Sequence, residues 1–146
     1  MQKRDSRCSL HAETGVLQVQ RLNVPDLAEP PGYAHVVVAS GTRLVMTAGA
    51  VPVDAAGNLV GAGDVRAQAR QTLDNLMRQL GAAGATGEDV LKTTVYVAST
   101  DRADLGACWE EVQQSPLAAA ASTLLGVALL GYAGQLVEIE AIAVLP

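Results

Sequence analysis

Hydrophobic residues follow the two-residue period of a β-strand in several parts of the chain. Apolar and β-branched residues are typical of strands because they pack well on a pleated, half-buried surface. The predicted strands are His35–Ala39, Arg43–Thr47, Lys92–Val97, Ser122–Leu130 and Leu136–Leu145. A loop of three residues, Ser40-Gly41-Thr42, separates the first two strands. Because so short a loop with a central glycine is typical of a tight turn, we expect these two strands to form a β-hairpin.

Two other stretches repeat apolar residues every three to four positions, which is the period of an α-helix. In the first stretch, Asp64 is placed as an N-cap and Gly81 as the C-terminal stop. The second begins at Thr100-Asp101 and ends at Ser115-Pro116. The first stripe consists of Val65, Ala69, Thr72, Leu73, Leu76, Met77 and Leu80. The order β-β-α-β-α-β-β predicts an α+β fold with both helices on one face of the sheet.

Residues 1–30 precede this pattern. Apolar residues alternate from Val16 to Leu22, and the alternation stops at Pro25. We therefore expect residues 1–30 to form a tail with one candidate edge strand. Residues 31–146 then form the single domain, a division that suits a chain of 146 residues.

The last predicted strand is apolar on both faces. One face carries Val137, Ile139, Ala141 and Ala143, and the other carries Leu136, Ile142 and Val144. Helices on one side of the sheet leave the second face without a cover. In so short a chain another copy of the protein is the expected cover, so the pattern predicts a homo-oligomer.

Charge and composition narrow the range of partners. From Asn23 onward six Lys and Arg residues stand against thirteen Asp and Glu, and aromatic residues make up 3% of the chain. Binding to nucleic acid needs the opposite charge balance and more stacking surfaces, so we expect no nucleic-acid partner. The two cysteines and two histidines lack the spacing of metal ligands, so no metal site is expected, and a reducing cytoplasm fits this cysteine usage.

One segment is long and apolar enough to raise the question of a membrane span. Leu117 to Gly134 carries no charge, but it is mostly alanine and glycine and has no flanking Lys or Arg. We expect a strand buried on both faces there, and no membrane association.

Glu138 and Glu140 are the strongest candidates for catalysis on physical grounds. They lie two positions apart on the last strand and therefore project from the same face. Burial tends to raise the pKa of a carboxyl group, as a general acid or base requires. The alternative is that one or both lie at a wet subunit edge or pair with an arginine of a neighbour. Tyr33, in a loop, is either a pocket residue or a packing lid.

Four motifs occur in an order that is specific to one family. They are Thr47–Pro52 (TAGAVP), Gln68–Leu76 (QARQTLDNL), Lys92–Val95 (KTTV) and Val137–Ala143 (VEIEAIA). From Tyr33 to the C-terminus the chain thereby resembles the reactive-intermediate deaminase family, called Rid or YjgF and also labelled endoribonuclease L-PSP. The resemblance implies a chorismate-mutase-like α+β protomer with a mixed sheet and a homotrimer with clefts between subunits. It also implies hydrolysis of reactive enamines and imines to ketones and ammonia without a cofactor.

The resemblance assigns roles to residues of this chain, but several differ from the family pattern. Glu138 matches the water-positioning glutamate and Tyr33 the loop tyrosine. The resemblance implies substrate-binding positions at Tyr33, Ala48, Gly49, Ala121, Ser122 and Thr123, the last two through their backbone amides. Ala121 stands where the family has an arginine that grips the substrate carboxylate, and Ala48 stands where it has a serine. No Lys or Arg follows Arg102.

These departures shape the expected function. The resemblance then implies cofactor-free hydrolysis of a small neutral or cationic enamine, imine or carbonyl compound that is not anchored by a carboxylate–arginine pair. The alternative is a non-catalytic trimer that binds a small ligand or a protein partner. A ribonuclease is a third reading, which the acidic charge balance opposes.

Overall fold

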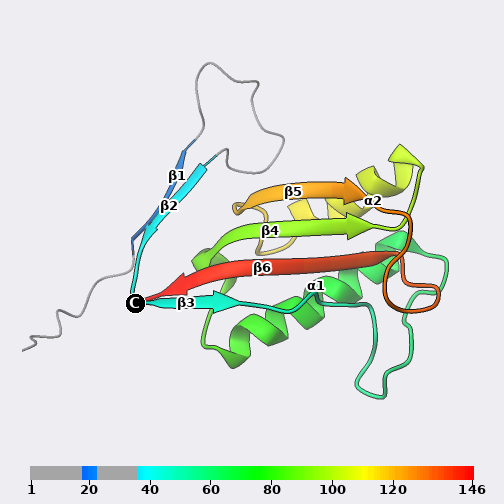
Figure 1. The fold of residues 1–146 in the computed structure, drawn as a ribbon, viewed down its shortest axis with the longest axis horizontal. Helices are drawn as coiled ribbons and strands as arrows, with labels where there is room; N and C mark the ends of the chain where they lie inside the picture. Colours follow the sequence, from blue (N-terminus) through cyan, green and yellow to red (C-terminus); the bar gives the residue numbers. More distant parts are fainter. Residues whose placement is uncertain (1–17, 23–35) are drawn as a thin grey trace, which may run out of the picture.

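The computed structural model describes residues 18–22 and 36–146 (Figure 1). Six strands lie in this part of the chain: β1 (Gln18–Leu22), β2 (Val36–Ser40), β3 (Arg43–Met46), β4 (Val90–Val97), β5 (Ala121–Gly126) and β6 (Val137–Leu145). Two α-helices accompany them, α1 (Val65–Ala82) and α2 (Arg102–Gln113), together with a 3₁₀ turn at Gly87–Asp89.

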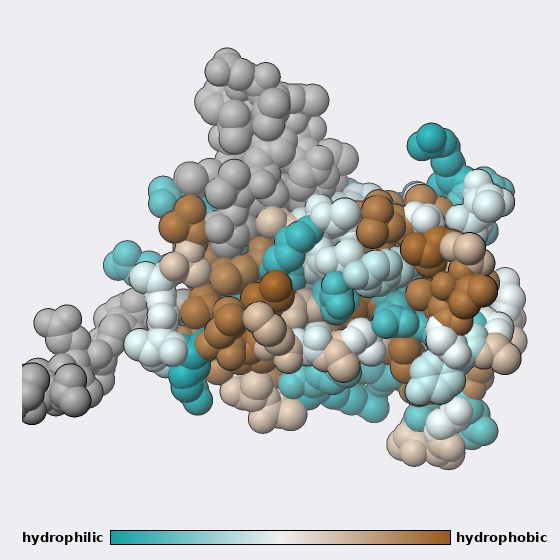
Figure 2. Space-filling model, in the orientation of Figure 1, coloured by the Kyte–Doolittle hydropathy of each residue, from teal (hydrophilic) through white to brown (hydrophobic). Residues whose placement is uncertain are grey.

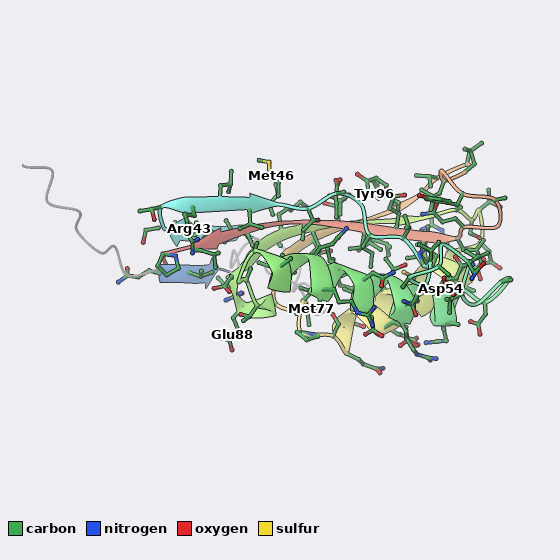
Figure 3. All side chains as sticks on the ribbon, turned by 90° about the horizontal axis from the view of Figure 1, so that it is seen from below. Arg43, Met46, Asp54, Met77, Glu88 and Tyr96 are labelled. Atoms are coloured by element: carbon green, nitrogen blue, oxygen red, sulfur yellow. The ribbon has the colours of Figure 1, made fainter. Side chains whose placement is uncertain are left out.

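The central element is a four-stranded mixed sheet with the order β3-β6-β4-β5. β6 runs antiparallel to both of its neighbours, and β4 and β5 are parallel. Both helices lie on one face of this sheet (Figure 3). The α+β class, the mixed sheet and the one-sided placement of the helices are thereby confirmed.

The predicted hairpin is wrong. β2 pairs antiparallel with β1 in a separate two-stranded sheet, whereas β3 pairs with β6. β3 continues the ladder of the last strand, with Arg43 opposite Leu145 and Thr42 donating to the Leu145 carbonyl at 3.1 Å. Pairing along the core strand β6 outweighs the local turn, because it extends the sheet that the helices cover. The candidate edge strand is present as β1, but the proposed boundary at residue 30 lies outside the described residues.

Helix α1 begins as its sequence predicts and ends later. The Asp64 side chain accepts hydrogen bonds from the backbone amides of Arg66 and Ala67, both at 3.0 Å. The helix continues through Gly81, and the chain leaves it at Gly84, whose φ of +80° suits glycine. Gly84, not Gly81, therefore provides the C-terminal stop.

The uncharged segment from residue 117 to residue 134 does not form a helix. It contains a turn, the strand β5 and a loop, so the predicted strand Ser122–Leu130 is shorter than expected. Among the residues that the structure describes, no helix is long and apolar enough to cross a bilayer.

The hydrophobic core lies between the sheet and the helices. Its fully buried residues include Leu76, Leu80, Cys108, Val112, Val95, Val97, Val137 and Ile139. Glu111 of α2 joins the two helices, because Nε and Nη2 of Arg70 both donate to its carboxylate at 2.9 Å and Nη1 of Arg66 donates at 3.4 Å. The core is therefore closed on one side of the sheet by paired helices.

The opposite side of the sheet, which we call the open face, carries no helix of the described part of the chain (Figure 3). Leu44 and Met46 of β3 are 61% and 68% exposed there, while Val144 beside them is 7% exposed. Figure 3 shows Met46 and Tyr96 projecting away from the helices. In Figure 2, hydrophobic residues gather over the end of the sheet that contains β3, and more polar residues cover its middle. An exposed apolar patch of this kind marks a surface suited to association.

Candidate active site on the open face

Glu138 projects from β6 onto the open face, and a buried amide holds its carboxylate in place. Gln135 Nε2 donates to Glu138 Oε2 at 3.0 Å and to the Val137 carbonyl at 3.1 Å. The Gln135 carbonyl oxygen accepts from the Tyr132 amide at 3.0 Å, and Gln135 is 4% exposed. Because both ends of the amide are engaged, it fixes the position of the carboxylate.

Gly49 forms a second wall of the Glu138 position. A Cβ atom at residue 49 would lie 2.0 Å from Glu138 Oε1, so only glycine allows this close approach. The segment around Gly49 is tied to β6 here, since Ala50 and Ile139 exchange backbone hydrogen bonds of 2.8 and 3.1 Å. The structure thus brings the predicted residues Gly49 and Glu138 into contact, with exposed Ala48 next to them.

The three predicted residues of β5 divide between the two faces of the sheet. Ala121 and Thr123 lie opposite Lys92 and Thr94 of β4 and share the open face with them. The Ser122 side chain points to the helix side, where its Oγ accepts from buried Thr93 at 2.8 Å. Only the backbone of Ser122 can therefore contribute to a site on the open face.

Glu138 and Ala121 do not meet within one chain. Glu138 lies opposite Tyr96 of β4, and Ala121 lies opposite Lys92. Four residues along a strand correspond to about 13 Å. A small molecule that touches both positions therefore needs a second copy of the chain.

Glu140 has a different environment from Glu138. Tyr96 Oη donates to Glu140 Oε1 at 2.8 Å, and this hydrogen bond raises the pKa of Tyr96. The carboxylate is thus engaged with a neighbour on the same face.

The sequence did not predict two side chains that lie near Glu138 and Ala121, namely Gln135 and Lys92. Gln135 is recognisable only by its burial behind Glu138. Lys92 precedes the C-terminal segment in which the resemblance places a cation, so its sequence position does not point to the site. The fold brings Lys92 beside Ala121 from β4, and Nζ donates to the Thr93 carbonyl at 3.1 Å and to Thr123 Oγ1 at 2.5 Å. Burial lowers the pKa of Lys92, and the charge of Glu140 opposes that shift.

The remaining candidates add little to this site. Tyr33 lies outside the described residues. Within residues 18–22 and 36–146, no group of three or more His, Cys, Asp and Glu side chains is arranged to hold a metal ion. Cys108 is buried in the core, and burial raises the pKa of its thiol to about 12. Its role is therefore packing.

The sequence and the fold are both similar to proteins of one family. The family model described as endoribonuclease L-PSP matches residues 26–145. A RutC family protein of Haemophilus influenzae is 47% identical over 55 residues, which are 38% of this chain and 42% of that protein. A 2-iminobutanoate/2-iminopropanoate deaminase of Salmonella typhimurium is 44% identical over 68 residues, or 46% of this chain and 52% of that protein.

The matches to these two curated relatives span about half of their length. A solved structure extends the likeness to nearly the whole chain. A Rid family protein of unknown function from Yersinia pestis aligns with a TM-score of 0.80 at 36% identity, covering 87% of this chain and 98% of that one.

Proposed function

Since the chain belongs to the endoribonuclease L-PSP family, which includes the Rid and YjgF proteins, we propose that it hydrolyses the C=N bond of a small reactive imine or enamine. The reaction takes place in clefts between the subunits of a homotrimer and needs no cofactor. The observation that carries this proposal is the fixed carboxylate of Glu138, held by Gln135 and walled by Gly49. The deaminase name of the Salmonella relative supports the same reaction class.

Glu138 acts as the base that activates water. The enamine first takes up a proton from solvent at its β-carbon and becomes an iminium ion, and a water molecule held by Glu138 attacks the iminium carbon. The new C–O bond forms as the C=N π electrons move to nitrogen, and Glu138 accepts a proton from the water. That proton then goes to the nitrogen and the C–N bond breaks. Ammonia leaves as the hydroxyl gives its proton to Glu138 and becomes a carbonyl, and Glu138 returns that proton to solvent. A positioned base of this kind contributes typically 10²- to 10⁴-fold to rate.

The separation within one chain supports a cleft between subunits. Along β4, about 13 Å separates Tyr96, which lies opposite Glu138, from Lys92, which lies opposite Ala121. A second copy on the open face brings the Ala121–Thr123 stretch of one chain toward Glu138 of another. The exposed Leu44 and Met46 supply apolar surface for that association.

The substrate is not anchored by a carboxylate–arginine pair. Ala121 has no side chain that can donate, and no arginine lies on the open face among the described residues. Arg43, the arginine of the four-stranded sheet in that part of the chain, lies opposite Leu145 of the helix side. A substrate is therefore held by other contacts, and its identity differs from that of an arginine-bearing relative.

Ammonia release from enamines generated in situ tests the proposal. Glu138→Gln keeps the shape of the side chain and loses the base, so we expect turnover to fall by about 10²-fold or more while the assembly and ligand affinity remain. Glu140→Gln, on the same face one strand step away, should cause a much smaller loss. Equal losses at both positions would indicate a structural pair instead of a base.

The same assay separates the second candidate function. The small side chains of Ala48 and Ala121 also suit a trimer that binds a ligand without turnover. If the wild-type protein releases no ammonia from any enamine yet binds a small molecule in the cleft, the binding function replaces the enzymatic one, and Glu138 becomes a ligand contact.

A further inference from the structure

Gln68 of α1 is fully buried, and its amide joins the helix to two loops. Its Nε2 donates to the Gly61 carbonyl at 3.2 Å and to the Gly134 carbonyl at 3.0 Å. Its Oε1 accepts from the Leu136 amide at 2.7 Å. Because breaking these contacts would leave buried polar groups unpaired, Gln68 holds the segment 134–136 firmly against the start of α1.

The contacts of Gln68 with this segment lie on the two chain neighbours of Gln135. The Gly134 carbonyl before it and the Leu136 amide after it are both bonded to the buried amide of the helix. The side chain of Gln135 donates to Glu138 Oε2 at 3.0 Å. The backbone is thus held on each side of the residue that holds the carboxylate.

Asn75 of α1 holds the segment on the other side of the carboxylate. Its Nδ2 donates to the Val51 and Val53 carbonyls, both at 2.8 Å. Its Oδ1 accepts from Gln71 at 3.2 Å, so this amide is engaged at both ends. Val51 follows Gly49 by two residues, and Gly49 lies so close to the carboxylate that no Cβ fits between them.

Gln68 and Asn75 are seven residues apart in α1, which corresponds to about two turns, so both lie on one side of the helix. We propose that both are positioning residues for the Glu138 carboxylate. Gln68 acts on the carboxylate through Gln135, and Asn75 acts on it through Gly49. The inference rests on the proposed function and assigns a part in it to the helix. Neither side chain is a catalytic residue, because each acts through a backbone segment.

Two substitutions test the inference in the ammonia-release assay. Gln68→Met keeps an unbranched side chain of similar length and removes both polar ends. Asn75→Ala removes the second contact at a half-buried position where alanine favours the helix. We expect kcat to fall by about 10- to 100-fold in each variant, since a displacement of about 1 Å at a reacting group has an effect of this size. KM should stay within about twofold, because neither side chain contacts the substrate.

Thr72→Val is the matched control on the same helix. Thr72 lies between the two positions and is fully buried, and its Oγ1 has no hydrogen-bond partner among the residues that the structure describes. The variant therefore keeps the shape of the side chain and removes a buried hydroxyl that holds no other segment. It should leave kcat and KM unchanged.

A second measurement does not depend on turnover. The Nε2 protons of Gln135 are bound by Glu138 and by the Val137 carbonyl, so we expect them to exchange slowly with solvent in the wild type. Heteronuclear NMR follows this exchange, and Gln135→Met identifies the resonances by their loss. The Gln68 and Asn75 variants should each exchange about tenfold faster, as loss of roughly one hydrogen bond implies. Thr72→Val should exchange at the wild-type rate.

The two measurements separate this inference from the proposed function. In a folded Gln68→Met protein, wild-type kcat or unchanged Gln135 exchange overturns the inference, and wild-type ammonia release then leaves the hydrolysis standing. A loss carried by KM alone also overturns it. Faster exchange in both variants of a protein that releases no ammonia from any enamine retains the positioning of Glu138 and rejects the hydrolysis. If Gln68→Met does not fold, Asn75→Ala decides by the same two measurements.

Discussion

Replacing Gly49 with alanine tests how strictly the Glu138 carboxylate must be positioned. The new Cβ would lie 2.0 Å from Glu138 Oε1 and 2.7 Å from its Cδ, both far inside van der Waals contact. The backbone cannot yield readily, because Ala50 and Ile139 are joined by hydrogen bonds of 2.8 and 3.1 Å. The Glu138 side chain must therefore turn away.

The size of the effect follows from the contact that is lost. Turning Glu138 breaks its 3.0 Å hydrogen bond from Gln135, and a hydrogen bond to a charged group contributes about 1.5–3 kcal/mol. If the transition state loses the same stabilisation, kcat falls by about 10- to 100-fold. The fold should survive, since this loss is smaller than the typical 5–15 kcal/mol free energy of unfolding.

The assay is steady-state ammonia release from an enamine generated in situ, combined with thermal unfolding followed by circular dichroism. Gly81→Ala is the matched control, because residue 81 lies inside α1 with nothing within 4 Å of an added Cβ. It should stabilise the helix by about 0.5–1 kcal/mol and leave turnover unchanged. Wild-type turnover in a folded Gly49→Ala protein would refute the argument that carboxylate position governs the reaction.

Three further predictions concern assembly, acid stability and the buried thiol. Met46→Asp should dissociate the proposed trimer with little loss of folding stability in the protomer, because Met46 is 68% exposed. Light scattering measures the mass, and a monomeric wild type at micromolar concentration would contradict the trimer. Glu111→Gln should lower the free energy of unfolding in urea by about 1.5–3 kcal/mol at neutral pH. The hydrogen bonds from Arg70 hold the pKa of Glu111 below its ordinary value of 4.5, so the stabilisation it provides is present above that pH and is lost as the pH falls through the lowered folded value. In Glu111→Gln the free energy of unfolding should therefore fall less steeply with decreasing pH than in the wild type. An unchanged pH dependence would rule out this ion pair as its cause. In a Cys8→Ser background, Cys108 should react with a thiol reagent at pH 8 only as fast as the protein unfolds, because burial raises its pKa to about 12; rapid labelling of the folded protein would show that α2 opens locally.

The sequence by itself determined the elements whose signals are local. The period of apolar residues and the Asp64 cap specify α1, and Asp101 caps α2 by accepting from the Ala103 amide at 2.8 Å. Alternation along β6 specifies which of its side chains enter the core and places Glu138 and Glu140 together on the other face. Periodicity and capping act over a few residues, so one segment carries all the information needed.

Only the tertiary structure decided which strands pair and which side chains meet. β3 pairs with β6, about a hundred residues away in the sequence, and not with its sequence neighbour β2. The pairing depends on how much apolar surface each strand edge allows to be buried. The contact of Gly49 with Glu138, and that of Lys92 with Thr123, likewise join separate segments through the register of the sheet. Strand register is set by competition among all pairings at once, and no local pattern reports its outcome.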